Sequence, residues 1–188
     1  GALPWMAFCD AVSRGMNSLI DAGGVLQKNA LAPVLFPVRS VLASGIIFGP
    51  LIALVALAYL PSHGFSSAIL ALLPLLLLQL LLCFLMAYLL AVLAAALRDS
   101  VRVVAFLLSV GIYLSPVLFP LSLFPADWRW VLWANPMTAL VLGYQAVLLQ
   151  GAWPGMEVWV GAGAWILGLG VLLNMLVRRS RDELVDWL

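Results

Sequence analysis

The sequence predicts an all-α protein, a polytopic bundle of transmembrane helices. Hydrophobic residues make up 65% of the 188 residues, and the mean hydropathy is +1.16. Charged residues make up only 9%, against about 25% in soluble domains. Long uncharged runs recur, and about 20 apolar residues suffice to cross a bilayer. This composition excludes a soluble globular domain, a disordered chain and a nucleic-acid-binding protein, which would need a basic stripe.

The first predicted span covers residues 1–27 and is interrupted by Asp10, Arg14 and Asp21. Asp10 and Arg14 are four residues apart, so on a helix they share one face and can form an ion pair. A charged pair within a membrane faces a bundle interior or a water-filled cavity. Two interpretations stay open: the pair neutralises itself as part of the packing, or it lines a polar pathway.

The later spans are marked by uncharged runs that end at turns or charges. A connection at residues 28–39, with Lys28 and Arg39 at its ends, precedes them, and a charged tail at 178–188 follows them. Ser115-Pro116 interrupts the third of the four runs. The predicted spans after the first are residues 41–60, 66–97, 103–115 and 158–177. We therefore expect about five spans in this chain, together with one outer hairpin between the last two.

Basic residues set the orientation, because cytoplasmic loops of membrane proteins are enriched in lysine and arginine. One orientation places seven basic residues inside and only Arg129 outside, with Arg14 within the first span. Residue 1 then starts outside, and the tail ends inside. The seven inside residues are Lys28, Arg39, Arg98, Arg102, Arg178, Arg179 and Arg181.

The same orientation forbids a crossing by residues 137–149. Residues 116–136 lie outside and the tail lies inside, so the single crossing by residues 158–177 is enough. The segment is also only 13 residues long, between Asn135-Pro136 and the GAWPG turn at 151–155. We predict that residues 116–156 form a re-entrant outer hairpin. A membrane tolerates such a hairpin only where protein or a water-filled cavity satisfies its backbone.

Aromatic residues gather at the start of this hairpin. Six of the 20 aromatic residues (8 Trp, 4 Tyr and 8 Phe) lie between residues 113 and 133. They are Tyr113, Phe119, Phe124, Trp128, Trp130 and Trp133. One interpretation is an interfacial aromatic belt, which many membrane proteins carry. The other is a platform of ring faces for an elongated, hydroxyl-rich ligand at a pore exit.

The sequence carries no recognisable motif for chemistry of its own. It has no HExxH motif, no Cys/His cluster and no nucleophile elbow. It also has no GxxxxGK loop followed by Ser or Thr, so any ATP would have to be bound by another chain. We therefore predict a protein that is not an enzyme, with no metal site and no cofactor bound by this chain.

The outer region resembles the gate region of bacterial polysaccharide export permeases. These are the membrane subunits of ATP-binding cassette exporters for O-antigen, teichoic acid and capsular chains. The resemblance is carried by residues 114–121 (LSPVLFPL), 125–130 (PADWRW) and 135–138 (NPMT). Residues 3–5 (LPW) with 17–19 (NSL) are similar to the second span of that family. Residues 33–37 (PVLFP), after Lys28, look like its cytoplasmic coupling segment.

The resemblance implies a multi-pass permease of the bacterial inner membrane that exports a lipid-linked polysaccharide of the O-antigen or teichoic acid type. It implies a homodimer with two ATPase subunits, which would bind ATP and Mg²⁺, and no nucleic-acid partner. Three groups of candidate residues follow. The translocation path would use Trp5, Asp10, Arg14 and Tyr113. The outer gate would use Ser115, Pro116, Phe119, Trp128, Trp130, Trp133, Asn135 and Pro136. The ATPase-coupling segment would use Lys28, Pro33, Phe36, Pro37 and Arg39.

The sequence departs from the family pattern in two ways. Family members usually begin with a cytoplasmic amphipathic helix and one more span, so we expect a fragment without its start or a product begun late. Relatives also often carry an acidic residue after the first proline of the coupling segment, and residues 33–37 have none. The competing hypotheses are a related ATP-driven permease for a drug or a lipid, a secondary transporter, and a membrane-embedded enzyme.

Overall fold

The computed structural model describes residues 1–26, 28, 31–63, 67–119 and 123–180. Its regular structure is helical, and these residues form no strand. The longer helices are α1 (Ala2–Asp21), α3 (Leu35–His63), α4 (Leu72–Ala96), α5 (Ser100–Gly111), α7 (Thr138–Gln150) and α8 (Met156–Ser180). The shorter elements are α2 (Gly23–Leu26), η1 (Ser67–Ala71), η3 (Ala126–Trp128) and α6 (Arg129–Trp133). The prediction of an all-α helical bundle is confirmed.

Three segments in the described part of the chain are long and apolar enough to cross a membrane. They are Leu35–Tyr59, Ser67–Ala96 and Met156–Arg179. Helix α1 has 20 residues but carries charges, and α5 and α7 have only 12 and 13 residues. At 1.5 Å per residue, α5 is about 18 Å long, which is shorter than the hydrocarbon core of about 30 Å. The run at residues 103–115 is thus helical only to Gly111 and continues in turns.

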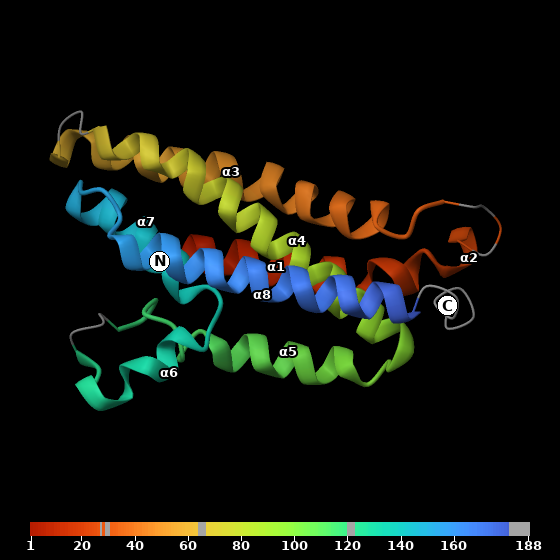
Figure 1. The fold of residues 1–188 in the computed structure, drawn as a ribbon. Helices are drawn as coiled ribbons and strands as arrows, with labels where there is room; N and C mark the ends of the chain where they lie inside the picture. Colours follow the sequence, from red (N-terminus) through yellow and green to blue (C-terminus); the bar gives the residue numbers. More distant parts are fainter. Residues whose placement is uncertain (27, 29–30, 64–66, 120–122, 181–188) are drawn as a thin grey trace.

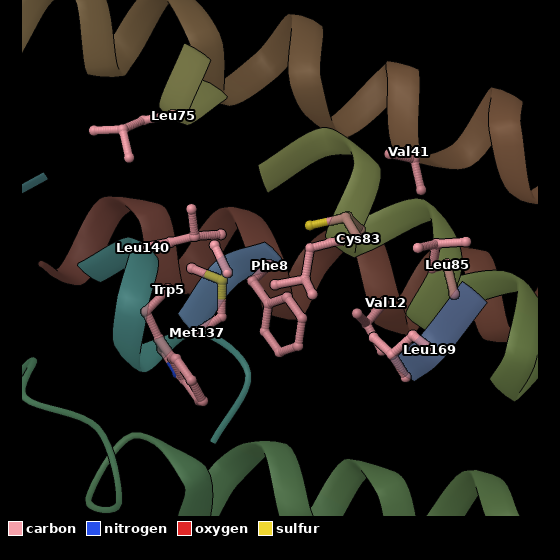
Figure 2. Packing of buried hydrophobic residues seen from close by; sticks show 14 of the residues in the cluster. Trp5, Phe8, Val12, Val41, Leu75, Cys83, Leu85, Met137, Leu140 and Leu169 are labelled. Carbon is pink, nitrogen blue, oxygen red and sulfur yellow. The ribbon is translucent and has the colours of Figure 1, made fainter. Parts of the chain in front are cut away.

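Helix α1 is the centre of the bundle. It packs against α3 and α4, and α4 also packs against α8 (Figure 1). Its buried apolar side chains recur every three or four residues, as expected of a helix with one packed face. Figure 2 shows the core side chains Phe8 and Val12 of α1 near Cys83 and Leu85 of α4, and Trp5 of α1 near Met137.

Small residues let α1 and α4 approach closely. A Cβ atom at Gly15 would lie 2.4 Å from the Cβ of Ala87, so only glycine fits there without moving a helix. Gly45 of α3 is similarly close to Leu80 of α4, where a Cβ would lie 2.9 Å from the leucine side chain. Gly49, one turn further along α3, has nothing within 4 Å of such a Cβ. Gly45 therefore takes part in the close packing of α3 against α4, and Gly49 does not.

Helix α3 begins at Leu35, earlier than the predicted span at residue 41. Its first turn contains Pro37, which is tolerated there because the first N–H groups of a helix have no partner within it. The second half of the predicted coupling segment at residues 28–39 is therefore the first turn of α3.

The helices run between two ends of the bundle (Figure 1). Helices α1, α4 and α8 finish at the end where α3 and α5 begin. We call this the basic end, because it holds six of the seven basic residues that are predicted to lie inside. They are Lys28, Arg39, Arg98, Arg102, Arg178 and Arg179. Arg181 lies outside the described residues. The opposite end holds residues 112–119 and 123–136 and the α7–α8 turn, and we call it the aromatic end.

Candidate functional site

Asp10 of α1 is hydrogen-bonded both within its own helix and to α3. The Arg14 Nε atom lies 2.8 Å from Asp10 Oδ1, so the ion pair expected from their spacing is present. Ser44 of α3 donates its hydroxyl to the other carboxylate oxygen, Oδ2 of Asp10. The Arg14 side chain is 53% exposed and that of Asp10 is 25% exposed. The pair therefore lies on the open side of α1, away from its seam with α4.

A groove of about 780 Å³ opens beside this pair, between α1 and the first turns of α3. Arg14 and Asn17 line it from α1, and Phe36 and Arg39 line it from α3. The structure thus brings together residues predicted for two separate roles, the translocation path and the coupling segment. The remaining polar lining residues are Ser13, Ser18, Asp21 and Ser40. We call this the α1–α3 groove.

The other two predicted path residues lie elsewhere. Trp5 is buried, and its ring centroid lies 5.7 Å from that of Phe8. A Cβ at Gly111 would lie 2.9 Å from the Trp5 ring, so Trp5 forms the contact between α1 and the end of α5. Tyr113 follows α5 and is exposed. The four residues predicted for the path therefore do not form a single cluster.

Asn135 holds the turn between α6 and α7. Its Nδ2 atom donates to the carbonyl of Gly111 at 3.1 Å, which ties the α6–α7 turn to the end of α5. Its Oδ1 atom accepts the N–H of Met137 at 3.0 Å. One side chain thus satisfies a donor and an acceptor of irregular backbone.

Two further side chains in the hairpin also bind backbone. Thr138 donates its hydroxyl to the carbonyl of Leu132, six residues earlier. Gln145 Nε2 donates to the carbonyl of Pro116 at 2.6 Å. The first of these bonds lies in a fully buried environment. Polar side chains therefore take the place of water for the non-helical backbone at this end.

The three tryptophans predicted for the outer gate separate into two kinds. Trp133 packs against α8, where a Cβ at Gly161 would lie 2.6 Å from its ring. Its carbonyl accepts the indole N–H of Trp165 at 3.1 Å. Trp128 and Trp130 instead are 62% and 68% exposed. Trp133 is a packing residue, and the other two present free ring faces.

The remaining gate residues also divide between surface and interior. Phe119 is half exposed. Ser115 is buried, and its hydroxyl has no hydrogen-bond partner among the described residues. Pro136 lines an apolar cavity of about 360 Å³, together with Trp5 and Phe8 of α1 and residues of α4 and α5. The predicted gate is therefore a folded segment, of which only part of the aromatic surface is open.

The predicted coupling residues surround the start of α3. Lys28 is exposed between α2 and α3, and Arg39 is exposed on α3. Pro33 is partly buried and Pro37 is buried. Phe36 is partly buried and forms part of the wall of the α1–α3 groove.

Sequence reasoning missed a buried polar network that joins three helices. Tyr144 of α7 donates its hydroxyl to Gln79 Oε1 of α4 at 2.7 Å. Gln79 Nε2 in turn donates to the carbonyl of Pro4 in α1 at 2.9 Å. A signal was available, because Gln79 is the only strongly polar side chain in the long apolar run at residues 66–97. Within the described ranges, no group of three His, Cys, Asp or Glu residues is placed to hold a metal ion.

Comparison with known proteins places this geometry in context. A family model described as ABC-2 type transporter matches residues 2–149. The chain is 26% identical to the O-antigen export system permease protein RfbA of Myxococcus xanthus, over 99% of this chain and 73% of the relative. It is 21% identical to the protein of the same name from Klebsiella pneumoniae, over 80% of this chain and 59% of the relative.

Proposed function

Because the chain belongs to the ABC-2 type transporter family, we propose that it is the membrane permease subunit of an ATP-driven polysaccharide exporter. The substrate would be a lipid-linked polysaccharide of the O-antigen type, carried from the cytoplasm across the inner membrane. The observation that carries this proposal is the family match over residues 2–149. It is supported by the similarity to permeases whose names specify O-antigen export.

The proposal includes partners that the chain itself does not contain. An ATP-binding cassette subunit would bind ATP and Mg²⁺, since this sequence has no phosphate-binding loop of its own. A second copy of the chain would face the open side of α1. Arg14 is exposed there, and a charge within a membrane needs water or protein beside it. The path for the glycan would then lie between the two copies.

The basic end is the proposed contact with the ATPase. The prediction that this end faces the cytoplasm follows from its six basic residues, since cytoplasmic loops favour lysine and arginine. Residues 28, 31–39 and 98–102 lie there, and they include the first turns of α3 and α5. Closure of the ATPase subunits would press on these connections and rock the helices as rigid bodies.

The aromatic end is the proposed exit. We assign residues 116–156 to a hairpin that enters the outer leaflet and returns to the same side; residues 120–122 within it lie outside the described residues. The turn at residues 133–138 lies beside Gly161, which is five residues, or about 7.5 Å, into α8. The bonds from Asn135, Thr138 and Gln145 to backbone supply what irregular structure requires at membrane depth.

The proposal is tested by deleting the gene in its native host. Loss of the permease should remove the polysaccharide from the cell surface and leave lipid-linked glycan on the cytoplasmic face of the inner membrane. A plasmid copy should restore surface glycan, provided that the partner ATPase can hydrolyse ATP. Unchanged surface glycan, together with altered efflux of a drug or a phospholipid, would favour the related exporter instead.

A further inference from the structure

We propose that the α1–α3 groove binds a phosphate ester group at the basic end of the bundle. The inference goes beyond the export proposal, because it assigns a specific binding site and does not require that the glycan pass through it. It rests on how Arg14 is held, on what faces it across the groove, and on the level of the groove in the bundle.

Arg14 is fixed in a way that leaves its outer edge available. Asp10 accepts a hydrogen bond from the Nε atom of Arg14 at 2.8 Å, and Ser44 holds Asp10 from the other side. No hydrogen bond from either terminal nitrogen of Arg14, Nη1 or Nη2, is formed within the described residues. A guanidinium anchored through Nε presents these two nitrogens as a preformed fork for two oxygens of one oxyanion.

Arg39 faces the same groove from α3. It is exposed and has no hydrogen-bond partner within the part of the chain that the structure describes. The two arginines therefore approach the groove from different helices, one anchored and one free. Ser13 and Asn17 also line the groove. One amide N–H of Asn17 is used by the Ser13 carbonyl, so its second N–H and the Ser13 hydroxyl are the donors that can add to the arginines.

The groove lies at the level of lipid headgroups if the basic end faces the cytoplasm. Arg14 is seven residues, or about 10 Å, from the end of α1 at Asp21. Arg39 is four residues, or about 6 Å, from the start of α3 at Leu35. Basic pockets between transmembrane helices on the cytoplasmic side are sites that bind phosphate-bearing headgroups. The same chemistry would recognise a phosphate carried by a lipid or a free phosphate.

Asp21 makes it possible to test whether the groove prefers an anionic ligand. Its carboxylate lines the same groove and would repel a bound phosphate. The groove therefore holds two cationic side chains and one anionic rim residue, besides Asp10, whose carboxylate is occupied by Arg14 and Ser44. Neutralising Asp21 should strengthen phosphate binding, whereas neutralising Arg39 should weaken it.

The experiment measures binding to the intact protein in a neutral detergent. The probes are short-chain phosphatidic acid, the matching diacylglycerol without phosphate, and inorganic phosphate. Phosphatidic acid should bind, and the diacylglycerol should not. Arg39→Gln should weaken binding about tenfold or more, and Asp21→Asn should strengthen it severalfold. Arg102→Gln, which removes a cation at the same end but outside the groove, is the matched control and should leave the Kd unchanged.

Arg14→Lys tests the fork itself. Lysine keeps the positive charge that pairs with Asp10, but it lacks two parallel N–H groups, so binding should weaken about tenfold while the fold is retained. Circular dichroism and size-exclusion chromatography verify the fold of each variant. Competition by inorganic phosphate at similar concentrations identifies a free-phosphate site, and its absence identifies a lipid headgroup site. Equal affinity for the diacylglycerol, or wild-type affinity in both arginine variants, would overturn the proposal. Either result would leave the export proposal standing, since that is tested by surface glycan.

Discussion

Polar side chains at the aromatic end bind irregular backbone in other segments, whereas those at the basic end bind only backbone of their own helix or line an open groove. Asn135, Thr138 and Gln145 each complete a hydrogen bond that irregular backbone would otherwise lack. At the basic end, Arg14 keeps two nitrogens free and Arg39 has no partner in the described residues. The difference separates a region whose polar groups stabilise irregular backbone from one whose two arginines keep donors available for a ligand.

This comparison predicts unequal responses to mutation. A polar or aromatic residue that holds the aromatic end together should cost stability when it is removed. A residue of the groove should cost little stability, because water already reaches it. Packed or hydrogen-bonded positions should therefore lose more stability on mutation than open positions.

Trp133→Ala should cause the largest loss. The ring packs on Gly161, and removal of a packed tryptophan leaves a cavity, so the free energy of unfolding should fall by about 3 kcal/mol. Denaturant unfolding in detergent, followed by circular dichroism, measures the change. Trp128→Ala is the control and should change stability by less than about 0.5 kcal/mol, because its ring is exposed.

Alanine variants of Trp128 and Trp130 separate the two interpretations of the aromatic cluster. If Trp128 and Trp130 guide the glycan, their alanine variants should reach the membrane in normal amount and export poorly. Anchoring at the interface instead predicts lower protein abundance, with export restored by tyrosine. Normal export at normal abundance in the double alanine variant would remove the guiding role.

Asn135→Ala should lower the free energy of unfolding by about 2 kcal/mol. It leaves the Met137 N–H and the Gly111 carbonyl without their partner, in a partly buried place. Asn17→Ala is the matched control at the basic end, where the side chain donates only to the carbonyl of Ser13 within its own helix. That variant should lose less than about 0.5 kcal/mol. An equal loss of stability in Asn135→Ala and Asn17→Ala would contradict the proposed difference between the two ends.

Gly15→Ala tests the close contact between α1 and α4. The new methyl group would meet the Cβ of Ala87, so α1 and α4 must separate, and we expect a net loss of about 1–2 kcal/mol. Gly49→Ala adds the same methyl group to a helix at a position with nothing within 4 Å. It should leave stability unchanged or raise it by up to about 1 kcal/mol through helix propensity. A loss at Gly49 equal to that at Gly15 would contradict the assignment of the close contact.

The parts of this fold that follow from local pattern were predictable. Uncharged runs that end at Pro, Gly or charged residues indicate the long helices, and a spacing of four indicates the Asp10–Arg14 pair. The division of basic residues between loops predicts which helix ends lie together, and the structure groups the six described residues at one end.

Contacts between distant segments were not predictable from pattern. Nothing local says that Gln79 meets Pro4 and Tyr144, although a lone glutamine in an apolar run signals some polar partner. The three tryptophans of the outer gate look alike in sequence, and only the approach of Gly161 to Trp133 separates them. In the same way, Arg14 and Arg39 share a groove because α1 and α3 are neighbours, which no spacing reveals.

The Asp10–Arg14 pair should show the smallest effect. In the isolated protein the groove is open to water, so a double-mutant cycle with Asp10→Asn and Arg14→Gln should give a coupling energy below about 1 kcal/mol. If a second copy covers the open side of α1, water is excluded and an orphan charge becomes costly. Each single variant should then impair export more than the double variant does, although the purified chain barely distinguishes them. The two measurements together test where the groove lies in the assembly. A double variant as impaired in export as the sum of the singles would mean that the two residues act separately, and that the groove stays wet in the working exporter.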